Sequence, residues 1–228
     1  MKVIQRTKKM KEKTLELTKD FVLAILAGVA ISIGGVAFLA SSSKIAGAIF
    51  FTVGLFMVCT LSLNLFTGKV GFALEKPPIY CVNLLVIWLG NLVGAVVSGY
   101  LIRATRISNT LVPVAESVAS GKINDSFLSI FVLAIFCNIL IFLAVYGFNK
   151  FESPLLKVLA LFFGVSVFVL AGFEHCVANM FYFSIANAWC DEAVLCIVAT
   201  TLGNIVGALF LPICFKFTKW LENKKESK

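Results

Sequence analysis

The sequence AGFEHCVANM, residues 171–180, places a glutamate and the chain's single histidine inside a long apolar stretch. This stretch covers residues 154–188, and a straight helix of that length would exceed the ~30 Å hydrocarbon core of a bilayer by roughly 20 Å. Glu174, His175 and Asn179 lie near its middle. Non-helical backbone at membrane depth is tolerated where it lines a cavity or is buried in protein. We therefore expect a membrane helix that is interrupted at these polar residues.

The composition is that of a polytopic membrane protein. Hydrophobic residues make up 60% of the chain, charged residues only 14%, and the mean hydropathy is +0.97. A membrane-spanning helix needs roughly 20 predominantly apolar residues, and six stretches are long enough. The predicted spans cover residues 20–41, 47–74, 79–102, 126–149, 154–188 and 192–217. The predicted fold is all-α, with six transmembrane helices.

The second span is irregular in the same way as the fifth. Its end reads LNLFTGK, residues 63–69, so that Asn64, Thr67 and Gly68 fall within two helical turns. A helix that breaks here would free backbone groups at membrane depth, as in the fifth span. We expect the second and fifth helices to be interrupted.

A short motif is repeated between the two halves of the chain. LGNLVGA at 89–95 lies in the third span and LGNIVGA at 202–208 in the sixth. Repeats of three spans each are inverted relative to each other in the membrane, which puts the two broken spans in equivalent places. Each copy also contains GxxxG, which lets helix backbones approach closely. The predicted inverted halves are residues 20–102 and 126–217.

Basic residues predict the orientation. Residues 1–20 hold seven Lys or Arg and residues 216–228 hold five. An even number of spans leaves both ends on one side, and positive residues favour the cytoplasm, so both termini are expected there, with the domain in the plasma (inner) membrane. The connection at 103–125 is expected to be an external loop because Pro113, Gly121 and Asn124 are turn formers. The expected parts are a basic segment at 1–19, one channel domain at 20–217 and a tail at 218–228.

Several classes of function are disfavoured. Much of the net charge of +8 sits at the two ends, where lysines beside anionic headgroups are expected, so a lipid bilayer rather than nucleic acid is the expected partner. One histidine cannot complete a Cys/His zinc set or a bis-His haem site. The sequence offers no nucleophile–base pair or phosphate loop. We therefore expect no enzyme activity, no metal and no cofactor.

His175 and Thr67 are the leading candidates for a pathway. Ionisable groups inside a membrane are costly and usually line a route for ions or substrates, although a packed histidine bonded to Asn179 or to a carbonyl remains the alternative. An imidazole can donate a hydrogen bond or a proton to a small anion. The Thr67 hydroxyl and the freed amide of Gly68 add donors, unless they merely begin an interfacial loop.

Two charged residues are expected nearby. Because Glu174 is adjacent to His175, its side chain is expected to point away from a pore that His175 faces. We interpret it as a structural residue that anchors neighbouring backbone amides or a tilted helix. Lys122 precedes the fourth span. It either attracts anions at the external side or extends to the interface.

The motifs GFEHCVANMF, LFTG and FCNILIFLAVY, in this order of elements, resemble the formate/nitrite transporter family, and most closely its hydrosulfide channel branch. The resemblance covers residues 20–217. It implies a homopentamer of aquaporin-like protomers, each with its own pore. Two departures are Cys176, where the family usually has Ser, and Tyr146, where it often has Trp.

The resemblance also implies roles for individual residues. It places the loop at 65–68 beside a central site that Thr67 and His175 form, and it matches Lys122 and Asn138 to the family's lysine and asparagine along the pathway. Asn179 is expected beside the same pathway. The hydrophobic constrictions implied by the resemblance are Leu55 and Leu65 on one side of the site and Phe66 and Phe168 on the other.

The predicted function is a channel for small monovalent anions of weak acids, namely hydrosulfide, formate or nitrite. A bare anion between apolar walls is costly, and the donors Thr67 and His175 would reduce that cost. Two alternatives remain: an aquaglyceroporin-like channel for neutral solutes, or a membrane anchor that transports nothing.

Overall fold

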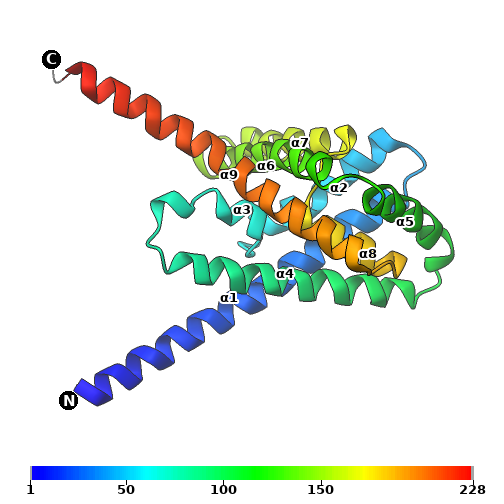
Figure 1. Cartoon of the computed structure of the whole chain (residues 1–228), viewed down its shortest axis with the longest axis horizontal. Coiled ribbons are helices and arrows are strands. Elements are labelled where there is room, and N and C mark those ends of the chain that lie inside the picture. The colour runs from blue at the N-terminus through cyan, green and yellow to red at the C-terminus, as the bar shows by residue number, and fades with distance from the viewer. Residues whose placement is uncertain (1, 227–228) are drawn as a thin grey trace.

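The computed structural model describes the backbone of residues 2–226 and the side chains of residues 12–225, and it contains helices but no strand in that part of the chain (Figure 1). The helices in chain order are α1 (Lys2–Leu39), α2 (Lys44–Thr60), α3 (Phe66–Val70), the 3₁₀ turn η1 (Ala73–Glu75), α4 (Tyr80–Arg103), α5 (Ser108–Ile123), α6 (Phe127–Lys150), α7 (Pro154–Ala171), α8 (Cys176–Ala186) and α9 (Asp191–Glu226). Helices α1, α4, α6, α7 and α9 are long and apolar enough to cross a membrane, and α2 and α8 are shorter apolar helices. The prediction of an all-α polytopic membrane protein is confirmed.

Both predicted interruptions are present. The second span is divided into α2 and α3, with Ser62 at a positive φ of 54° and Leu65 in extended conformation before α3 begins. The fifth span is divided into α7 and α8. Gly172 ends α7 in the left-handed conformation, with φ of 78°, which glycine adopts at no steric cost. His175 is the N-cap residue of α8.

The two halves repeat the same helix packing. In the first half α1 packs against α4, and in the second half α6 packs against α9. A Cβ atom on Gly94 of α4 would collide with the carbonyl oxygen of Ile25, and one on Gly207 of α9 would collide with that of Ile135. The repeated GxxxG motifs therefore sit at equivalent contacts, as close backbone packing requires. The two halves therefore share this helix contact, and the inverted orientation of one half relative to the other stays a prediction.

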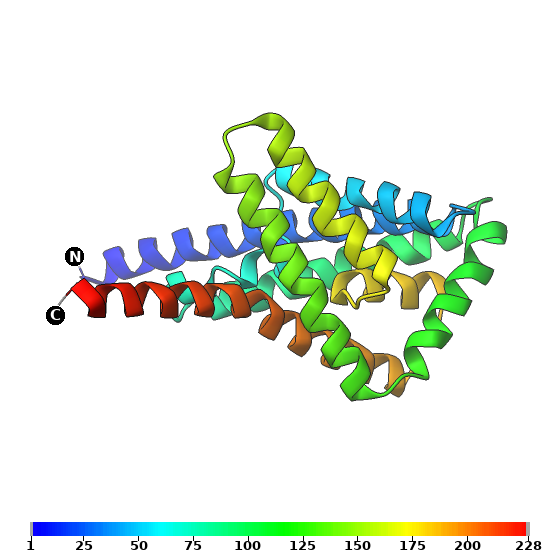
Figure 2. The ribbon, with the colours of Figure 1, turned by 90° about the horizontal axis from the view of Figure 1, so that it is seen from above.

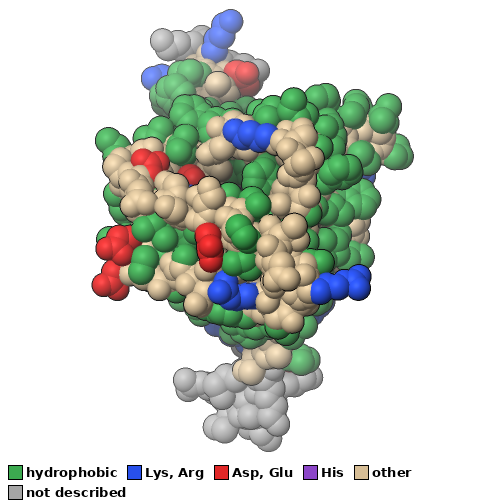
Figure 3. Space-filling model, turned by 90° about the vertical axis from the view of Figure 1, so that its right-hand side faces the viewer, with side chains coloured by type: hydrophobic (Ala, Val, Ile, Leu, Met, Phe, Trp, Pro, Cys, Tyr) green, Lys and Arg blue, Asp and Glu red, His purple; other side chains and the backbone are tan. Residues whose placement is uncertain are grey.

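The outer ends of α1 and α9 project from the same side of the molecule. In Figures 1 and 2 the N-terminal part of α1 and the C-terminal part of α9 project from the same end, while α5 lies at the opposite end. The expected boundary near residue 20 falls inside the continuous helix α1. Seen from the end opposite the termini (Figure 3), polar and backbone atoms occupy much of the middle of the face, and hydrophobic side chains gather towards its rim.

The prediction of an external loop at 103–125 was wrong for most of its length. Residues Ser108–Ile123 form α5, which packs against α8. Leu111, Ala115 and Ala119 are buried at four-residue intervals, which is one face of a helix. The apolar periodicity and the packing it allows outweigh the turn-forming tendency of Pro113 and Gly121.

We predict that Gly94→Ala destabilises the protein. The added methyl would meet the Ile25 carbonyl oxygen, and overpacking of this kind costs about 1–3 kcal/mol. The thermal unfolding midpoint of the detergent-solubilised protein should fall. Gly121→Ala in α5 is the matched control, because open space surrounds that position. Equal midpoints for the two variants would contradict the close α1–α4 contact.

Candidate functional site

Two asparagines hold the interrupted segments in place. The Oδ1 atom of Asn91 accepts a hydrogen bond from the backbone N–H of Phe66 (2.8 Å), the first residue of α3. Its Nδ2 donates to the carbonyl oxygens of Ala24 (2.8 Å) and Asn64 (2.9 Å). Because an N–H or C=O left unpaired in hydrocarbon costs several kcal/mol, this side chain stabilises the break directly.

Asn204 does the same for the second break. Its Oδ1 accepts from the backbone N–H of Cys176 (3.0 Å), the first residue of α8. Its Nδ2 donates to the carbonyl oxygens of Ala134 and Glu174, both at 2.9 Å. Asn91 and Asn204 are the asparagines of the two LGN motifs. Sequence analysis singled out the motifs but missed this role, and the signal was a polar residue repeated within otherwise apolar copies.

Thr67 and His175 meet at the point where the two breaks face each other. The Thr67 Oγ1 and His175 Nε2 atoms are 2.9 Å apart, and the two residues are 1% and 2% exposed. The backbone N–H of Ala178 donates to His175 Nδ1 (3.2 Å), so that nitrogen carries no proton. In a neutral imidazole the proton is then on Nε2, which donates to Thr67. The Thr67 hydroxyl proton therefore remains available to another acceptor.

Asn138 of α6 lies beside this pair. Its Nδ2 donates to the carbonyl oxygens of Thr67 (3.2 Å) and Asn204 (2.7 Å). The Oδ1 atom is buried and has no hydrogen-bond partner in the described part of the chain. Asn138 thus links the first break to the helix that anchors the second, and it leaves one acceptor unused.

Glu174 and Lys122 form a buried ion pair. The Lys122 Nζ atom lies 2.7 Å from each oxygen of the Glu174 carboxylate, with the two side chains 14% and 7% exposed. Asn179 Nδ2 donates to the same carboxylate (2.6 Å) and to Thr200 Oγ1 (3.2 Å). The hydrogen bonds described for the Glu174 carboxylate come from side chains, and the expected bonds to backbone amides are not found among the described residues. Lys122 neither points to solvent nor presents an uncompensated charge.

The residues expected to form constrictions are all buried: Leu55, Leu65, Phe66 and Phe168. The ring of Phe168 lies against the imidazole of His175, with centroids 5.8 Å apart and planes 24° apart. It also meets Phe51 edge-on at 5.9 Å. One of the four thus contacts the central histidine directly.

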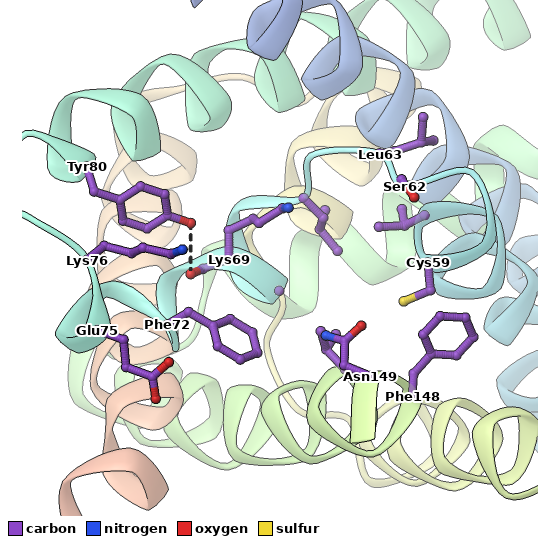
Figure 4. Close-up of a pocket in the computed structure, with 14 residues that line it drawn as sticks. Cys59, Ser62, Leu63, Lys69, Phe72, Glu75, Lys76, Tyr80, Phe148 and Asn149 are labelled. Carbon is purple, nitrogen blue, oxygen red and sulfur yellow. Dashed lines mark hydrogen bonds between the residues drawn. The ribbon is translucent and has the colours of Figure 1, made fainter. Parts of the chain in front are cut away.

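A cavity of about 340 Å³ adjoins the first break (Figure 4), and in Figure 1 the α3–α4 connection that contributes to its lining lies on the side from which the ends of α1 and α9 project. We call it the terminal vestibule. Its wall includes Ser62, Leu63 and Leu65 of the break between α2 and α3, and Gly68 of α3. The polar and charged residues of the lining are Ser62, Lys69, Glu75, Lys76, Tyr80 and Asn149. Aromatic rings of Phe72 and Phe148 complete it, so the vestibule combines ammonium groups with apolar walls.

The formate/nitrite transporter family model matches residues 2–218. A probable formate transporter of Methanothermobacter thermautotrophicus is 30% identical, with 93% of this chain and 92% of that protein covered. The formate channel FocA of Escherichia coli K12 is 31% identical over 72% of this chain and 64% of the relative.

Two solved structures are similar in fold. A pentameric formate channel with formate bound superposes with a TM-score of 0.76 at 26% identity, over 90% of this chain and 98% of that one. An ion channel of the same family superposes with a TM-score of 0.77 at 21% identity, over 92% of each chain, and that likeness concerns the fold alone. The named relatives are channels and transporters, not enzymes. With its two interrupted helices and a family match over nearly its whole length, this chain belongs to the formate/nitrite transporter family.

Proposed function

We propose that the protein is a channel for small monovalent anions of weak acids, with formate, nitrite and hydrosulfide as the candidate substrates. The observation that carries the proposal is the buried hydrogen bond between Thr67 Oγ1 and His175 Nε2. It places a polarised hydroxyl between apolar side chains at the meeting point of two interrupted helices. The formate channels and transporters among the relatives support the same substrate class.

The chemistry follows from the cost of desolvation. A bare anion that leaves water for an apolar passage loses hydration worth many kcal/mol. The Thr67 hydroxyl accepts a hydrogen bond from His175. This bond polarises the O–H bond of Thr67 and makes it a stronger donor, because hydrogen bonds in a chain strengthen one another. An anion that accepts from this hydroxyl recovers part of the lost hydration. Leu65 and Phe168 keep water away and so strengthen the interaction.

The ring geometry favours hydrogen-bond donation over proton donation by His175. A second proton on the imidazole would sit on Nδ1, where the Ala178 N–H already points at 3.2 Å. Two donors would then face each other, and the first turn of α8 would lose its cap, at a cost of about 1 kcal/mol. We therefore assign His175 as a neutral donor that acts through Thr67, and we assign any protonation of the substrate to water outside the constrictions.

The assembly and orientation belong to the same proposal. The solved relative with formate bound is pentameric, and we propose a homopentamer in which each protomer has its own pore. The basic tails favour a cytoplasmic location for both termini, and we propose that the protein lies in the plasma (inner) membrane. Residues 1–19 and 218–228 are the cytoplasmic segments, and residues 20–217 are the channel domain.

The transport prediction is tested with purified protein in liposomes. Formate, nitrite and hydrosulfide fluxes should each exceed that of chloride, because only weak-acid anions can also cross as neutral acids when the pH falls. Their fluxes should therefore rise as the pH is lowered, whereas that of chloride should not. Glycerol uptake, followed by liposome swelling, and water flux are measured in the same liposomes. Large glycerol or water fluxes without anion flux would indicate the channel for neutral solutes. Absence of every flux would point to a membrane anchor and refute the channel.

Substitutions at the central pair test the role of the hydroxyl. Thr67→Val keeps the shape and removes the donor, and the loss of a hydrogen bond to a charged group, worth about 1.5–3 kcal/mol, should lower anion flux by tenfold or more. Thr67→Ser is the matched control and should retain most of the flux. His175→Asn preserves a capping acceptor for α8 but removes the ring, and it should also reduce flux. Normal flux in Thr67→Val would refute the mechanism.

A further inference from the structure

Two lysines near the breaks differ in whether an acidic side chain compensates their charge. Sequence analysis singled out Lys122 as a cation for the pathway, but the Glu174 carboxylate compensates its charge at 2.7 Å. Lys69 is the last residue of the segment LNLFTGK in the broken second span. It is partly buried, it lies two residues after Thr67, and it forms no ion pair or side-chain hydrogen bond within the described part of the chain.

Lys69 faces the terminal vestibule. Figure 4 shows its side chain reaching from α3 towards the middle of the cavity, with Lys76 and Tyr80 on one side and Ser62 and Leu63 on the other. The one acid of the lining, Glu75, points its carboxylate away from the Lys69 ammonium in this view. The vestibule therefore holds an uncompensated ammonium group close to the entrance of the first break.

The surroundings strengthen the field of this ammonium. Clefts that carry one sign of charge on low-dielectric walls focus the electrostatic potential and raise the local concentration of the opposite charge. Phe72, Phe148 and Val145 supply such walls here. A cavity of about 340 Å³ has room for a small anion with part of its hydration shell.

We propose that Lys69 is the anion-capture residue of the terminal vestibule, which concentrates small monovalent carboxylates or inorganic anions there and positions them for transfer to the Thr67 hydroxyl. This inference rests on the proposed channel function. A lysine ammonium without an ion-pair partner in the described part of the chain suits the task, because a conduction site must bind well enough to load and weakly enough to release. A neutral acid gains nothing from it, so the site acts on the ionised form alone.

The test compares Lys69→Met with two control variants, Lys69→Arg and Lys219→Met. Lys219 is an exposed residue of α9 that does not line the vestibule. Formate influx into liposomes is measured against formate concentration at low and high ionic strength. Lys69→Met should raise the half-saturating concentration by about three- to tenfold and flatten its dependence on salt. Lys69→Arg should stay near the parent protein, and Lys219→Met should not change.

A second measurement does not depend on transport. NMR line-broadening of isotope-labelled formate, titrated with each detergent-purified variant, reports binding directly. Weaker binding by Lys69→Met than by Lys219→Met supports capture even if no flux is found, in which case only the channel function fails. The inference would be overturned if Lys69→Met and Lys219→Met bound formate equally well and had equal half-saturating concentrations. An equal loss of formate binding in both variants would also overturn it, because the effect would then come from general surface charge.

Discussion

The fold depends on how two helix breaks are satisfied in a medium that offers no water. Each break exposes backbone N–H and C=O groups, and each is held by one asparagine that accepts from the first N–H of the following helix and donates to two carbonyls. Asn91 and Asn204 are both fully buried. The packing glycines beside them bring the helices close enough for these bonds to reach. Without the asparagines, several unpaired groups would face hydrocarbon, and continuous helices would be the more stable alternative.

The shared scaffold carries different chemistry in its two halves. The bonds of the two asparagines make Asn64 equivalent to Glu174 and Phe66 equivalent to Cys176, and Leu65 is then equivalent to His175. One break therefore presents an apolar side chain and the other an imidazole. This asymmetry leaves the Thr67–His175 pair as a cross-connection between halves, with the hydroxyl from one break and the ring from the other. The repeat thus accounts for the two helix breaks, and the differences in sequence between its copies account for the Thr67 hydroxyl and the His175 ring that meet there.

The sequence was sufficient for the features that depend on local pattern. The excess length of residues 154–188, the polar residues within it and the repeated LGN motif predicted the two breaks, which the structure contains. The helix at 108–123 was missed because turn formers were weighed above the spacing of Leu111, Ala115 and Ala119. The pairing of Lys122 with Glu174 joins residues 52 positions apart, and no sequence period reports such a contact. For the same reason, the open charge on Lys69 became visible only when the cavity around it was known.

The distribution of charge bears on how such a passage can conduct at all. An uncompensated lysine at the central pair would hold an anion too tightly to release it, whereas apolar walls alone would exclude it. The structure has neither extreme. The cation nearest Asn179 is neutralised by Glu174, the centre offers a hydroxyl and a neutral ring, and the open ammonium lies outside, in the vestibule. On the proposed pathway, the attraction would be strongest where the anion is still hydrated. A weaker hydrogen bond would replace it where the anion is most confined, and this order would permit both entry and escape.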